Sequence, residues 1–268
     1  MARTPGGLHY DIHPGPGPDA PTVILSAGLG GAAGFWAPQM AALAQRFRVI
    51  GYDHRGAGKS VRELTRPHSV EAMAADIVEV LDDAQVERAH LIGHAAGGLA
   101  GLALGLAAPQ RLGKLVVVNA WAAPDPHIAR CFEVRLTLLN DSGPAAYVRA
   151  QPLFLYPPAW ISGNSERLAA EEPHHIAAFP PLDVVRARIA AVLAWDIADR
   201  LADIQTPVLV AAAADDSLIP AHCSEHLAAG LPNAQLQVVP WGGHGYTVTA
   251  PEVFNASVID FLSPRDGS

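Results

Sequence analysis

The sequence predicts one α/β domain with a mostly parallel central sheet, helices on both faces of the sheet and a helical insertion. Apolar strand-like segments alternate with helix-like segments over most of the chain. Most of the strand-like segments are continuous apolar runs, as parallel strands covered on both faces are. The alternation stops between about residues 122 and 195, where the chain is helix-like and rich in proline, and it returns afterwards.

Each expected element has its own local signal. Short, mainly apolar runs predict strands at residues 22–26, 47–53, 89–93, 114–119, 207–213 and 234–239. Apolar residues at helical spacing predict helices at 35–46, 69–84, 95–108, near 221–229 and at 251–262. The helix at 69–84 has the clearest start, because Ser69 is a good N-cap and Glu71 lies in its first turn.

The helix-like block interrupts one sheet and is not a separate domain. We expect a core at about 1–121 and 196–268, with a helical cap inserted at about 122–195. The 268 residues are enough for such a domain.

Composition excludes several classes of partner. Half of the residues are apolar, the formal net charge is −8, and there is no run of Lys or Arg, so a nucleic acid partner is not expected. The apolar run LAGLALGLAA is too short to span a bilayer, and MARTPGGLHYD has no apolar stretch typical of a signal peptide. We expect a cytoplasmic protein with a small-molecule substrate, as a monomer or homodimer. The two cysteines have no metal-ligand spacing, and neither a metal nor a cofactor is expected.

Four loops each follow a predicted strand, which places them at one edge of the sheet. They are SAGLGG at 26–31, GHAAGG at 93–98, ADDSLIP at 214–220 and WGGHG at 241–245. Together with YDHRGAGKS at 52–60, this layout resembles the α/β-hydrolase fold. The chain order also matches that fold, with a nucleophile position followed by an acid and a histidine.

The loop at 93–98 resembles a nucleophile elbow that has lost its nucleophile. Gly93, Gly97 and Gly98 supply the room that a sharp strand-to-helix turn needs. Ala95 stands at the position that normally holds serine, and its methyl group cannot attack a substrate. The backbone N–H groups of Leu29 and Ala96 would form an oxyanion hole, since the first N–H groups of a helix favour an anion.

His244 and Asp216 are the expected proton-transfer pair. An imidazole can take and return a proton near neutral pH. Asp216, four residues before Pro220, would orient the ring and stabilise its charged form. Asp215 is the alternative acid, and Ser217 is interpreted as a turn residue.

No other side chain is a convincing replacement for the missing serine. Ser26 lies at the end of its strand, while Cys131 lies in the cap and Cys223 in a helix beyond the acid loop. Each is interpreted as a packing or turn residue. His94 is expected to be structural and to point away from the His244 side.

A more specific resemblance comes from stretches outside these loops. Together with GHAAGG, the chain resembles the RutD family of α/β-hydrolase-fold proteins in SAGLGGAAGFW (26–36), VNAW (118–121), RCFEVR (130–135) and QPLFLYPPAW (151–160). The resemblance implies that Ala95 is native and that the protein acts late in pyrimidine-ring breakdown. The implied reaction is hydrolysis of carbamate to ammonia and carbon dioxide, or of aminoacrylate to malonic semialdehyde and ammonia.

The alanine itself favours an unstable substrate. Losing a triad serine costs on the order of 10⁶ in turnover, whereas about 10³–10⁴ over water remains from the oxyanion hole and binding. A residual of that size is useless for a stable amide but useful for a compound that already decays. We therefore expect non-covalent proton transfer and no acyl-enzyme.

The pocket is expected to be small and closed by the cap. Trp36 and Trp121 flank the predicted site, and Phe154 and Tyr156 could close it, although ordinary core packing explains these aromatic residues equally well. Arg130 and Arg135 are the nearest cap cations in the sequence and would suit a small carboxylate.

Two other functions stay open. In one, the protein is an engineered ester or C–C bond hydrolase in which Ala95 replaces a native serine. In the other, it is a non-catalytic binding protein on the same fold, although such a protein would have no chemical need of Asp216 and His244.

Overall fold

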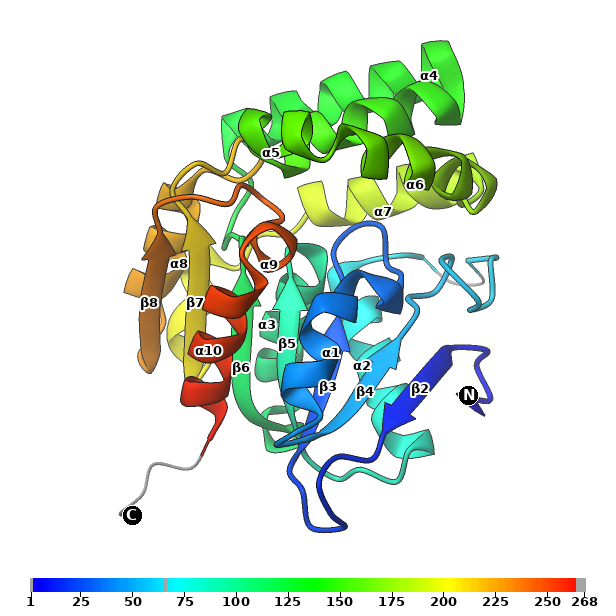
Figure 1. Cartoon of the computed structure of the whole chain (residues 1–268). Coiled ribbons are helices and arrows are strands. Elements are labelled where there is room, and N and C mark those ends of the chain that lie inside the picture. The colour runs from blue at the N-terminus through cyan, green and yellow to red at the C-terminus, as the bar shows by residue number, and fades with distance from the viewer. Residues whose placement is uncertain (1, 65–66, 264–268) are drawn as a thin grey trace.

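The computed structural model describes residues 2–64 and 67–263, which form an eight-stranded sheet in the order β1-β2-β4-β3-β5-β6-β7-β8 (Figure 1). The strands are β1 (Ala2–Arg3), β2 (His9–His13), β3 (Thr22–Ser26), β4 (Arg48–Tyr52), β5 (Ala89–His94), β6 (Leu112–Val118), β7 (Val208–Ala213) and β8 (Ala234–Val239). The six strands from β3 onwards run parallel to one another, so their carboxyl ends meet at one edge. This is the predicted α/β-hydrolase architecture.

The sequence did not predict the first two strands. β2 pairs with β4 in antiparallel register, with Tyr10 opposite Tyr52 and His13 opposite Val49, and β1 pairs with β2. Only the first residues of β2 are buried. These strands extend the sheet away from the loops of interest.

Helices cover both faces of the sheet and a group of helices lies above its carboxyl edge (Figure 1). One face carries α1 (Ala37–Leu43), α9 (Tyr246–Thr249) and α10 (Pro251–Leu262), and the other carries α2 (Val70–Asp83), α3 (Ala96–Ala107) and α8 (Ala221–Gly230). This upper group, called the cap below, contains α4 (Pro126–Leu155), α5 (Pro158–Gly163), α6 (Ser165–Ala177) and α7 (Leu182–Leu193). Short 3₁₀ helices lie at Ala33–Trp36, Pro109–Arg111 and Ala198–Asp203.

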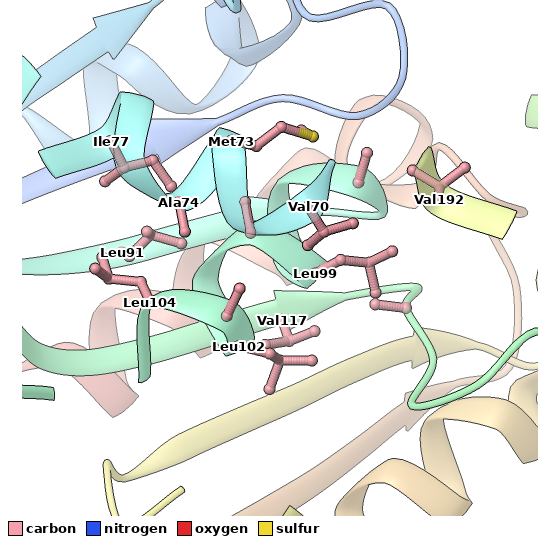
Figure 2. Packing of buried hydrophobic residues seen from close by; sticks show 14 of the residues in the cluster. Val70, Met73, Ala74, Ile77, Leu91, Leu99, Leu102, Leu104, Val117 and Val192 are labelled. Atoms are coloured by element: carbon pink, nitrogen blue, oxygen red, sulfur yellow. The ribbon is translucent and has the colours of Figure 1, made fainter. Parts of the chain in front are cut away.

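The sheet separates two hydrophobic clusters. The larger one joins α2, α3, β5 and β6 through residues such as Ile77, Leu91, Leu99 and Val117 (Figure 2). The glycines and alanines of α3 permit this close packing, and the α3 residues from Ala96 to Gly105 are all buried. The same cluster extends into the cap through Val192 of α7, so the cap and core share one apolar interior.

The cap is not made of simple straight helices. α4 breaks at Gly143, whose φ of 81° is a conformation that favours glycine. Within the described residues, no helix is long and apolar enough to cross a membrane.

Candidate active site

The loop between β5 and α3 is a sharp turn centred on Ala95. This residue adopts φ 46° and ψ −114°, a strained combination for any residue with a Cβ. Its N–H donates to Val118 O at 2.8 Å, which ties the turn to the end of β6. Glycine is required beside it, because a Cβ at Gly97 would collide with the Ser26 backbone and a Cβ at Gly93 with the Gly97 backbone.

Two backbone N–H groups are left open beside this turn. Neither Leu29 N–H nor Ala96 N–H donates to another group in the part of the chain that the structure describes. Ala96 is the first residue of α3, where unpaired N–H groups and the helix dipole favour an anion. The structure thus leaves the donors of the expected oxyanion hole available.

The structure brings His244 and Asp216 together. His244 Nδ1 lies 2.8 Å from Asp216 Oδ2, and both side chains are buried. Asp216 is fixed by the N–H groups of Leu218 and Ile219, which donate to its Oδ1 at 2.8 Å. His244 Nε2 has no partner among the described residues and is not one of the atoms sealed from solvent. The ring is therefore oriented by Asp216 and keeps its second nitrogen open.

The other acid of the loop has a different task. Asp215 Oδ1 accepts a hydrogen bond from Gly243 N at 2.8 Å. It therefore braces the histidine loop through the backbone, while Asp216 is the carboxylate that contacts the imidazole.

The expectation that His94 points away from His244 is wrong. The two rings pack edge to face with centroids 4.6 Å apart, and His94 Nε2 lies 2.8 Å from His244 O. Burial lowers the pKa of His94 to about 3, so the ring is neutral and Nε2–H donates to that carbonyl. A residue directly before the elbow thus supports the histidine loop from the side.

Asn119 is a second support that sequence reasoning missed. Its Nδ2 donates to His244 O at 2.6 Å, and its Oδ1 accepts from Ala213 N at 3.2 Å. The residue has φ 48°, a conformation that asparagine tolerates better than most residues. The polar residue at the end of the apolar run KLVVVN was the available signal.

Arg188 of α7 is the second functional candidate that the sequence did not single out. Its guanidinium is buried and donates to Leu29 O, Arg55 O and His54 Nδ1, each at 3.0 Å. Burial lowers the pKa of Arg188 to about 10, a range in which it is still protonated at neutral pH. The same burial holds the pKa of His54 well below its usual range, so His54 accepts from Arg188. Arg188 therefore fastens the loop that carries Leu29 to the cap.

The two arginines predicted for the pocket have different environments. Arg130 is exposed, so the structure does not bring it to the site. Arg135 is only 5% exposed, and its Nη2 donates to Tyr147 Oη at 2.7 Å. Its guanidinium carbon lies 5.6 Å from the Phe154 ring centroid, so two of the predicted pocket residues are in contact.

The remaining predicted aromatic residues are divided between site and core. Trp121 is buried in the cluster that contains Ala96 and the cap. Tyr156 is part-buried beside the histidine loop, because a Cβ at Gly245 would lie 2.6 Å from its ring. Trp36 belongs to the other cluster, where it stacks on Phe254, so it is core and not pocket.

None of the three replacement nucleophiles resembles an activated one. Ser26 Oγ is occupied by Tyr52 Oη at 2.9 Å and His54 Nε2 at 3.1 Å. Burial raises the pKa of both thiols, that of Cys131 and, to about 11, that of Cys223, which disfavours a thiolate.

Cys223 does have neighbours that its sequence spacing did not predict. The ligand atoms of Asp125, His222 and Cys223 all lie within 4.8 Å of one another. His222 Nε2 lies 3.1 Å from Asp125 Oδ2, so this group connects the start of α4 to α8.

Comparison with known proteins agrees with the fold. The family model described as "Serine aminopeptidase, S33" matches residues 17–248. A protein of Caulobacter sp. (strain K31) named "Putative carbamate hydrolase RutD" is 63% identical and covers 98% of both chains. Among solved structures, a hydrolase from Pseudomonas aeruginosa PA01 is 30% identical, with a TM-score of 0.83 and coverage of 96% of this chain and 94% of that one. The enol-lactonase from Burkholderia xenovorans LB400 is 26% identical, with a TM-score of 0.87 and coverage of 98% and 99%.

Proposed function

The chain belongs to the RutD family of α/β-hydrolase-fold proteins, and on that premise we propose that it hydrolyses a small, labile intermediate of pyrimidine catabolism. The substrate is carbamate or aminoacrylate, and the C–N bond is the one that breaks. The observation that carries the proposal is a buried, oriented His244–Asp216 pair beside an elbow whose central residue is Ala95. Proton transfer is available there, whereas covalent catalysis is not.

For carbamate, the reaction needs one proton and a site for the carboxylate. The carboxylate oxygens accept from the N–H groups of Leu29 and Ala96. Protonated His244 gives its Nε2 proton to the carbamate nitrogen, the C–N electron pair leaves with that nitrogen, and ammonia and carbon dioxide form. Asp216 accepts from Nδ1 throughout, which holds the ring and stabilises its charged state.

For aminoacrylate, the same histidine acts twice. Its Nε2 proton goes to the carbon next to the carboxylate, which converts the enamine to an iminium ion. His244 then accepts a proton from the water that adds to the iminium carbon, which gives a carbinolamine. His244 returns this proton to the amine nitrogen, the C–N electron pair leaves with ammonia, and the hydroxyl loses its proton to give malonic semialdehyde. Neither route uses an acyl-enzyme, so Ala95 is compatible with both.

Ammonia release above the spontaneous rate tests the proposal. Carbamate and aminoacrylate are each generated in situ, and their decay is followed without protein, with the wild type and with His244→Ala. We expect acceleration by the wild type for at least one compound, and a loss on the order of 10²–10⁴ in His244→Ala, the usual worth of a general acid–base. His226→Ala, which removes an exposed histidine of α8, is the matched control. Equal rates for wild type and His244→Ala would refute the histidine's role.

A further inference from the structure

We propose that Arg135 of α4 is an anchor for the carboxylate of the substrate, in addition to the N–H groups of Leu29 and Ala96. The inference deepens the proposed function and rests on it for the identity of the substrate. Four features carry it: the burial of the guanidinium, the lack of an acidic partner, the rigid aromatic surround and the position on α4.

Arg135 is a buried cation without a counter-ion. The residue is only 5% exposed. None of the ion pairs within the described residues includes it. A buried charge is costly to keep unpaired, so such a position favours an anionic ligand.

Most of its hydrogen-bonding capacity is also unused. A guanidinium has five N–H donors, and the only one engaged among the described residues is an Nη2 donor, which binds Tyr147 Oη. The buried polar atoms without a partner include none of Arg135, so its other nitrogens are in contact with solvent. A side chain that is buried as a whole thus presents its free donors to an accessible space.

Aromatic rings hold the guanidinium in place without neutralising it. Its central carbon lies 5.2 Å from the ring centroid of Phe132, 4.9 Å from that of Tyr147 and 5.6 Å from that of Phe154. Rings attract a cation through their faces but accept no N–H in the way a carboxylate does. The arrangement therefore fixes a fork of donors in advance, which suits bidentate binding of a carboxylate.

The break in α4 is what creates this surround. Twelve residues of straight helix would separate Arg135 and Tyr147 by about 18 Å along the axis. The break at Gly143 brings the second half of α4 back, so that Tyr147 Oη reaches Arg135 Nη2 at 2.7 Å. The aromatic cage of Arg135, made of Phe132, Tyr147 and Phe154, therefore comes from the two segments of α4 on either side of the break.

The position on α4 connects the cage to the site. Cys131 lies one helical turn before Arg135, and its Sγ is 3.8 Å from Ser217 O, the residue after Asp216. Residues four apart share a face of a helix, so Arg135 lies on the α4 face that meets the acid loop. Phe154 leads directly into Leu155, whose carbonyl accepts from Gly245 N, next to His244.

The other buried cap arginine is not an equivalent candidate. Arg188 uses its Nε, Nη1 and Nη2 on Leu29 O, Arg55 O and His54 Nδ1. It holds the oxyanion loop, whereas Arg135 has free donors for a ligand.

Binding of propionate and its neutral amide, propionamide, tests the anchor independently of turnover. Saturation-transfer NMR titrations use the full-length wild type, Arg135→Gln, Arg135→Lys and Arg149→Gln. Arg149 is the matched control, because it lies on the same helix but is exposed and paired with Glu172. We expect propionate to bind about tenfold or more weakly to Arg135→Gln, as loss of a charge-assisted hydrogen bond implies. Arg135→Lys should keep part of the wild-type affinity, and Arg149→Gln should bind propionate as tightly as the wild type does.

The outcomes separate the two proposals. Propionate binding that needs Arg135, in a protein that accelerates neither compound, would support the anchor and refute the proposed function. Accelerated ammonia release with the same KM in wild type and Arg135→Gln would refute the anchor and leave the function standing. Equal loss of propionate and propionamide in Arg135→Gln would also refute it, because a carboxylate anchor acts on charge.

Discussion

Because the His94 ring is buried, we predict that the protein loses stability in acid. The size of this loss follows from the pKa of His94. In the folded protein burial lowers that pKa to about 3, whereas the unfolded value is about 6.5. Between these values the unfolded chain binds a proton that the folded protein does not, so the free energy of unfolding decreases as pH falls through this window. About pH 4.5 lies about two units below the unfolded pKa. At that pH the free energy of unfolding is therefore about 3 kcal/mol lower than at neutral pH.

His94→Gln isolates this contribution. Glutamine can still donate toward His244 O but cannot titrate. Urea unfolding at about pH 7.5 and about pH 4.5 gives the acid destabilisation of each protein. We expect it to be about 3 kcal/mol smaller in His94→Gln, with His226→Gln behaving like the wild type. Equal acid destabilisation in the variant and the wild type would show that His94 takes up a proton in the folded state, and that its ring does not pack against His244 as described.

Two further changes test the elbow and the loop that faces it. Ala95→Ser should hydrolyse p-nitrophenyl acetate on the order of 10²–10⁴ times faster than the double variant Ala95→Ser/His244→Ala. An acetyl-enzyme should also appear by mass spectrometry. Absence of both results would mean that the elbow and His244 do not share a pocket. Arg188→Lys should keep the fold by circular dichroism but slow accelerated ammonia release on the order of 10²-fold, because lysine cannot hold Leu29 O and Arg55 O together. An unchanged rate would exclude Leu29 from anion binding.

The chain order of the loops was enough to predict the sheet edge at which the site lies. Buried parallel strands are unbroken apolar runs, and the loops after them are forced to the same edge by topology. For this reason the sequence alone predicts that Ala95, Asp216 and His244 lie together. The same reasoning could not give β2, whose pattern is short and half-polar and whose pairing with β4 is a long-range event.

Side-chain direction was the other thing that sequence could not supply. Arg130 and Arg135 differ by five residues on one helix, which is enough to send one to solvent and the other into an aromatic cage. In the sequence, Arg188 has the pattern of an ordinary exposed cation on a helix. Its three hydrogen-bond acceptors lie on loops that are distant in the sequence, so only the folded structure shows its role. The contact of His94 with His244 could not be predicted, because it depends on the sharp turn at Ala95.

The conformation of Ala95 bears on the choice between a hydrolase and a binding protein built on its fold. Backbone strain of this kind costs on the order of 1–3 kcal/mol and persists only where the surroundings impose it. Here Gly93, Gly97 and the bond to Val118 O impose it although no nucleophile needs presenting. The turn still leaves Ala96 N–H unpaired at the start of α3. Two buried arginines of the cap, Arg135 and Arg188, are absent from the ion pairs of the described residues. A protein that only held a ligand would need the donors but not an imidazole oriented by a buried carboxylate, and this site has both.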